Sequence, residues 1–135
     1  MNPTRPWILL YQWAAGLCDT ATGALLIAAP AWTFALMKLT VLPRPVAFVR
    51  FVGAFVFCVG FTYLWAAAGW PLSEWRAQWR ITALIRTAAA LLLLWQIASG
   101  AMERGWMAVL LTDGILAAFQ WIGLARNWLD AAAQG

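Results

Sequence analysis

The sequence contains no histidine, the side chain that most often binds haem, chlorophyll-type pigments, copper and catalytic zinc. The two cysteines, Cys18 and Cys58, lie in apolar stretches and lack the CxxC or Cys/His spacing of a metal site. We therefore expect no metal and no cofactor. We expect both thiols to be buried and to pack as small apolar groups.

Charged residues are also scarce. They make up 10% of the 135 residues, whereas about 25% is usual in a soluble domain. Hydrophobic residues make up 64%, which predicts an all-α integral membrane protein with a single transmembrane domain over residues 1–135. The predicted spans are residues 7–29, 46–68, 81–98 and 106–125. Because the links between them are short, we expect an antiparallel four-helix transmembrane bundle.

Basic residues outside the spans indicate an orientation in the membrane. On the side of the N-terminus lie Arg5, Arg76, Arg80 and Arg126, and on the other side lie Lys38, Arg44 and Arg104. Since Lys and Arg gather on the cytoplasmic side of membrane proteins, this small excess favours an N-terminus inside the cell.

The predicted spans each carry one ionisable residue, in the order Asp19, Arg50, Arg86 and Asp113. A charge in the hydrocarbon core of a bilayer costs at least about 2.5 kcal/mol, so these side chains should face the bundle interior or a protein interface. Gln12 lies seven residues before Asp19, which places both on one helix face. Gln120 lies seven residues after Asp113 and therefore shares a helix face with it.

The depths of these residues suggest which of them pair. A rise of 1.5 Å per residue puts Asp19 about 18 Å and Asp113 about 20 Å from the N-terminal side, at the same level. Arg50 lies about 27 Å from that side, and its long side chain can bend inward to the carboxylates or outward to the headgroups. Arg86, counted from Ile81, is only about 8 Å deep and can reach the headgroups. We therefore expect Arg50 to pair with Asp19, with Asp113 or with both.

Two other roles for these charges stay open. The carboxylates can line a cavity that binds a polar or cationic ligand or relays protons. Alternatively, some of the charges can face a partner subunit and meet opposite charges there.

Glycines recur at seven-residue spacing in two of the spans. Gly16 and Gly23 share a face of the first span, and Gly53 and Gly60 share a face of the second. Small residues at such spacing let membrane helices approach closely, so we expect these glycines to pack helices together.

Three short motifs run through these spans: Arg50-x-x-Gly53 with Gly60, Asp113-Gly114, and Asp19-x-x-x-Gly23 followed by Pro30. Together they resemble small bacterial four-span membrane proteins of the DoxX-like type, several of which have no assigned activity. The resemblance implies a protein of the bacterial cytoplasmic (inner) membrane. Some DoxX-like members carry a histidine that this chain lacks, so we do not expect a shared redox chemistry.

The function that these features favour is a non-enzymatic accessory or scaffold subunit, either in a larger membrane complex or in a self-associating bundle. Its expected partners are membrane lipids and other membrane subunits or further copies of the chain, and not nucleic acid. The alternative is a small transporter or binder of a lipid-like, quinone-like or cationic ligand that uses the intramembrane Asp and Arg residues. An enzyme is not expected, because no nucleophile, metal set or phosphate loop accompanies the two acids.

Overall fold

The computed structural model describes residues 4–133, and every regular element in that range is helical. The elements are α1 (Thr4–Ala28), α2 (Pro30–Leu36), α3 (Val46–Gly69), α4 (Leu72–Ala98), the 3-10 turn η1 (Arg104–Trp106), α5 (Met107–Ala125) and α6 (Trp128–Ala133). The predicted all-α class is thereby confirmed over these residues. Residues 1–3 and 134–135 of the predicted domain lie outside the described residues, as does the side chain of Arg5.

Three helical segments are long and apolar enough to cross a membrane: Val46–Gly69, Leu72–Ala98 and Arg104–Ala125. They correspond to the second, third and fourth predicted spans. Helix α1 is also long, at 25 residues, but Gln12 and Asp19 lower the hydropathy of the stretch that contains them. The predicted membrane character is therefore supported by three helices.

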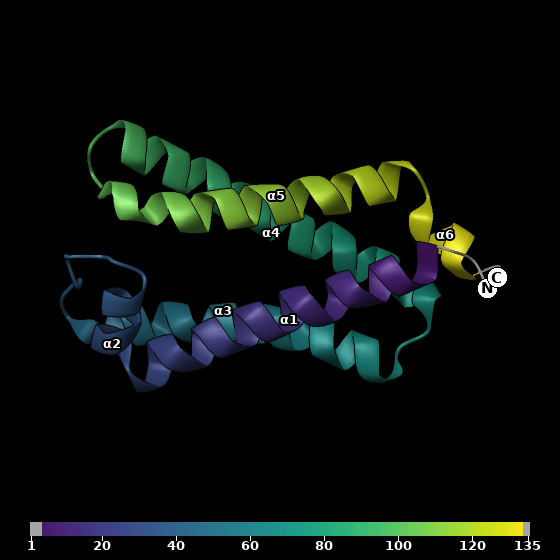
Figure 1. The fold of residues 1–135 in the computed structure, drawn as a ribbon, viewed down its shortest axis with the longest axis horizontal. Helices are drawn as coiled ribbons and strands as arrows, with labels where there is room; N and C mark the ends of the chain where they lie inside the picture. Colours follow the sequence, from purple (N-terminus) through teal and green to yellow (C-terminus); the bar gives the residue numbers. More distant parts are fainter. Residues whose placement is uncertain (1–3, 134–135) are drawn as a thin grey trace.

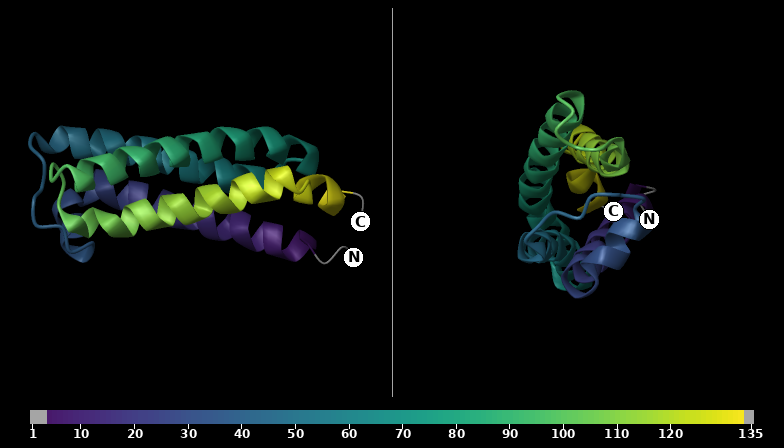
Figure 2. Two further views of the ribbon diagram at one scale, coloured as in Figure 1. Left: turned by 90° about the horizontal axis from the view of Figure 1, so that it is seen from above. Right: turned by 90° about the vertical axis from the view of Figure 1, so that its left-hand side faces the viewer.

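The four long helices lie in two pairs (Figure 1). Helix α1 packs along α3, and α4 packs along α5. Figure 2 shows that the chain turns back at each connection, so that α1 begins near α6 at one end of the molecule. We call this the terminal end. The opposite end, the loop end, carries α2 and the links of residues 37–45 and 99–106.

The contact between α1 and α3 contains the four glycines with predicted packing roles, Gly16, Gly23, Gly53 and Gly60. A Cβ atom added at Gly23 would lie 2.6 Å from the Cα atom of Phe57. One added at Gly60 would lie 2.7 Å from the Cβ atom of Asp19. Because carbon atoms do not approach so closely without a bond, only glycine allows the two backbones to sit at this distance.

An aromatic cluster joins the two pairs at the terminal end. Tyr11 of α1 stacks on Phe119 of α5 at 4.5 Å between ring centroids, and it meets Trp79 of α4 edge-on at 5.2 Å. Trp79 and Tyr63 are fully buried. Such ring pairs are worth about 0.5–1.5 kcal/mol beyond the area that they bury.

A second connection lies at the loop end. The Glu103 carboxylate accepts hydrogen bonds from the backbone N–H groups of Thr40 at 2.9 Å and Val41 at 3.1 Å, and from the Thr40 hydroxyl at 2.8 Å. These donors favour the ionised form and hold the pKa of Glu103 below its ordinary value. Beside them, Phe34 of α2 meets Trp106 edge-on at 5.7 Å. The two links are thus fixed to each other.

The glycine contact predicts a specific stability loss. Gly23→Ala and Gly60→Ala should each lower the free energy of unfolding by about 1–3 kcal/mol, because the added methyl group meets backbone that cannot move aside cheaply. Thermal unfolding of the purified protein in detergent measures the effect. Gly114→Ala is the matched control, since a Cβ atom there meets nothing within 4 Å. Equal melting temperatures for the three variants would contradict the close contact.

Candidate functional site

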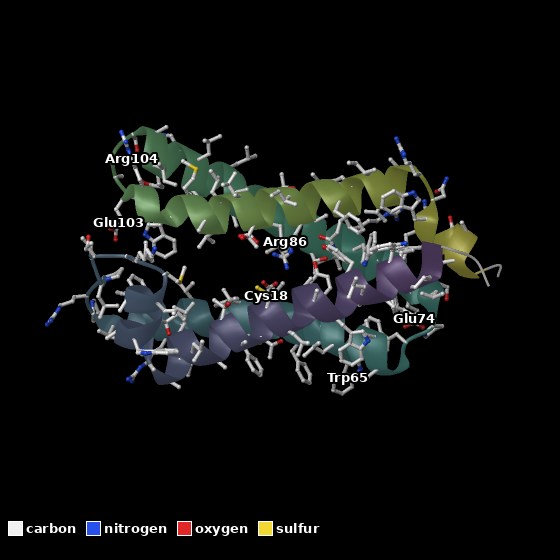
Figure 3. The ribbon with its side chains drawn as sticks, in the orientation of Figure 1. Cys18, Trp65, Glu74, Arg86, Glu103 and Arg104 are labelled. Carbon is white, nitrogen blue, oxygen red and sulfur yellow. The ribbon has the colours of Figure 1, made fainter. Side chains whose placement is uncertain are left out.

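The side chain of Arg86 binds groups from the other three long helices. Its Nη1 donates a hydrogen bond to Oδ1 of Asp113 at 2.6 Å, and its Nη2 donates one to Oδ2 of Asp19. Its Nε donates to the hydroxyl of Tyr63 at 3.3 Å. The Arg86 side chain is only 3% exposed and points between the two helix pairs (Figure 3). We call Asp19, Arg86 and Asp113 the charged cluster.

This arrangement corrects the expected pairing. Arg50, which we predicted to couple the acids, is the fifth residue of α3 and is exposed. It forms no ion pair with any residue between 4 and 133. The salt bridges to Asp19 and Asp113 come from Arg86 instead.

The error comes from the start of the third predicted span. Helix α4 begins at Leu72 and not at Ile81, so Arg86 lies fourteen residues, or about 21 Å, along the helix. A depth of about 21 Å matches the depths predicted for Asp19 and Asp113, whereas a helix that starts at Ile81 places Arg86 only about 8 Å deep. The earlier residues are helical because one face of this segment is buried, through Trp75, Gln78 and Trp79.

Next to the charged cluster lies a network of buried amides. Gln12 donates to Oε1 of Gln78 at 2.8 Å and accepts a bond from the indole N–H of Trp79 at 3.0 Å. Gln120 donates to the hydroxyl of Thr82 at 2.7 Å, and that hydroxyl donates to the backbone carbonyl of Gln78 at 2.8 Å. The two predicted site residues Gln12 and Gln120 are both fully buried.

Sequence reasoning identified part of this site and missed the rest. It missed Gln78 and the role of Thr82, although these residues and Arg86 follow one another at intervals of four. That spacing puts them on one face of α4 and is the signal that would have found them. It also missed Tyr63, because the residues three or four positions away, Val59, Gly60, Ala66 and Ala67, are apolar and give no such signal.

The two carboxylates are less enclosed than the guanidinium between them. The Asp19 side chain is 13% exposed and that of Asp113 is 19% exposed. Each gives one oxygen atom to Arg86, and the second oxygen atom of each accepts no hydrogen bond from a residue in the described range. The accessible side of the charged cluster is therefore its acidic side.

Other candidate features lie away from the charged cluster. Cys18 and Cys58 are exposed, so the expectation of two buried thiols is wrong. Within residues 4–133, no three His, Cys, Asp or Glu side chains gather as a metal site would require. Two surface hollows of about 420 and 410 Å³ open beside Trp70 and Trp65, and neither is lined by a residue of the charged cluster.

The contacts of Arg86 predict which arginine the fold needs. Arg86→Ala should lower the free energy of unfolding by about 3–5 kcal/mol, because it leaves two buried carboxylates without their cation. Arg50→Ala is the matched control and should change the melting temperature little, since Arg50 is exposed and forms no ion pair with another described residue. Adding Asp19→Asn and Asp113→Asn to Arg86→Ala should restore part of the loss. A larger loss from Arg50→Ala than from Arg86→Ala would contradict the assignment.

Comparisons with protein-family models, with curated proteins and with solved structures find no match for this chain. They neither support nor oppose the resemblance to DoxX-like proteins, which stays a prediction.

Proposed function

We propose that the protein is a non-enzymatic integral membrane scaffold, acting as an accessory subunit of a larger membrane complex or as a bundle that associates with its own copies. One observation carries this proposal: a single buried guanidinium holds both intramembrane carboxylates. A fixed ion pair of this kind locks helices together. A transport site would have to break it in each cycle, and a buried charge left without its partner costs about 3–5 kcal/mol.

The proposal includes an antiparallel bundle of four membrane-spanning helices, with α1 as the fourth span. In support of this, α1 turns Gln12 and Asp19 toward the other helices. Its outward face is apolar, with Trp7, Leu10 and Leu17 exposed. Such a helix is stable in lipid only when its partners satisfy the polar side chains. An N-terminus inside a bacterial cytoplasmic membrane also belongs to the proposal, on the basis of the loop charges and the resemblance.

The outer faces of the bundle suit the proposed partners. Helix α3 exposes a row of aromatic side chains, in which Phe51 contacts Phe55 and Phe61 contacts Trp65. Apolar rings on a membrane helix can pack against acyl chains, another subunit or a second copy of the chain. No feature of the described surface favours nucleic acid over these membrane partners.

The alternative function, transport or binding of a lipid-like, quinone-like or cationic ligand, has one observation in its favour. The carboxylates of Asp19 and Asp113 are partly accessible, and each has an oxygen atom that accepts no hydrogen bond from residues 4–133. A cationic ligand can approach them from that side.

The four-span arrangement predicts the side of the membrane on which each link lies. In a variant with Cys18→Ala and Cys58→Ala, single cysteines near residues 4, 70 and 133 should react with a membrane-impermeant maleimide from one side. Cysteines at residues 40 and 100 should react only from the other side. If α1 does not cross the membrane, residues 4 and 40 will react from the same side, which would refute the fourth span.

The scaffold proposal predicts what accompanies the protein. After gentle extraction, native mass spectrometry should find it in a stoichiometric complex with other polypeptides or with its own copies. Vesicles that contain the purified protein should show no flux of protons, small cations or lipophilic amines under an imposed pH gradient. A monomeric protein whose flux disappears in Asp19→Asn and Asp113→Asn, but persists in Asp130→Asn, would favour the transporter instead.

A further inference from the structure

The charged cluster contains more negative than positive groups. Asp19 and Asp113 carry two negative charges when both are ionised, and Arg86 carries one positive charge. Among the described residues, no other Lys or Arg bonds to either carboxylate. The titratable groups that face the cluster from the packed helices are the hydroxyls of Tyr11 on α1 and Tyr63 on α3, and a tyrosine side chain supplies no positive charge. One negative charge is left uncompensated.

Arg86 cannot supply the missing compensation. A guanidinium carries a single positive charge, and Arg86 already bonds to both Asp113 and Asp19. Its Nε donates a third bond to Tyr63, and its side chain is almost completely buried. The other carboxylate oxygens, Oδ1 of Asp19 and Oδ2 of Asp113, accept no hydrogen bond from Arg86 or from any other described residue.

An uncompensated charge is unfavourable in these surroundings. The cluster lies midway along helices whose outer faces are apolar, and two carboxylates that share one site resist being ionised together. The two carboxylate side chains are partly exposed, which gives a positively charged species a place to bind. The excess negative charge and the partial exposure of the carboxylates both favour a positively charged ligand.

We infer that the charged cluster binds one further monovalent positive charge at the carboxylate oxygens that accept no hydrogen bond from Arg86: a proton held by a carboxyl group, or a small cation such as Na⁺. This ligand brings the net charge of the cluster to zero. It also contributes to holding α1 of one helix pair beside α5 of the other. This binding site does not depend on the proposed scaffold function, because the excess negative charge is present whether the protein is a scaffold or a carrier.

Thermal unfolding of the full chain in a neutral detergent tests the inference, between about pH 5 and pH 9 and with Na⁺ or choline at constant ionic strength. If the ligand is a proton, the folded protein holds one more proton than the unfolded chain, whose aspartates are ionised in this range. The melting temperature should then fall as the pH rises, whichever cation is present. If the ligand is Na⁺, replacing it by choline should lower the melting temperature at high pH.

Single substitutions give the sharper test. Asp19→Asn and Asp113→Asn each leave one carboxylate for one guanidinium, so each should abolish the dependence on pH or Na⁺. At high pH each variant should melt at the same temperature as the parent or higher, although a hydrogen-bonded charge has been removed. Asp130→Asn, which removes an exposed carboxylate paired with Arg76, is the matched control and should keep the parent's dependence.

A parent protein whose melting temperature depends on neither pH nor Na⁺ would overturn the inference. So would single Asn variants that keep the full dependence. If the variants do not fold, infrared spectroscopy of the parent decides whether a proton is bound: a protonated carboxylic acid band at neutral pH supports the site. The absence of both that band and any effect of Na⁺ on melting refutes it.

Discussion

The hydrogen bonds of one arginine define how the long helices face each other. Arg86 projects from α4 and binds Asp113 on α5, Asp19 on α1 and Tyr63 on α3. A guanidinium is planar and its N–H groups have fixed directions, so these three contacts can form together in few arrangements of the four helices. The rotation of each helix about its own axis is therefore tied to that of the others. The same rotations turn Gln12 and Gln120 inward, where they form the buried amide network.

The helices associate by two different physical means. Within the α1–α3 pair, glycines such as Gly23 and Gly60 let the backbones touch, and dispersion between close-packed atoms stabilises the contact. Between the pairs, aromatic rings, amides and the charged cluster make the contact. Lipid offers no hydrophobic driving force for bringing helices together, so directional polar contacts give the association its specificity.

Much of the fold could be predicted from the sequence, because helix formation and membrane character depend on local periodicity and hydropathy. The same regularities placed Asp19 and Asp113 at one level and put Gln12 and Gln120 inside. The pairing partner could not be predicted in this way. The charged residues Glu74, Arg76 and Arg80 placed residues 72–80 outside the predicted span. The structure shows that the other face of this segment, with Trp75, Gln78 and Trp79, is buried against the neighbouring helices. Periodicity defines the faces of one helix and says little about which neighbour each face meets.

Helix α1 illustrates how the bundle changes the meaning of hydropathy. Its polar residues keep it out of the set of helices that are apolar enough to cross a membrane alone. Those same residues are the ones that Gln78 and Arg86 of α4 bind. Hydropathy measures the cost of placing a residue in lipid, whereas Gln12 is fully buried in protein and Asp19 is paired with Arg86. In the proposed bundle, α1 is therefore a span that depends on its neighbours. The Asp19 carboxylate lowers the hydropathy of α1, and the same carboxylate is the group to which Arg86 bonds at the middle of the helices.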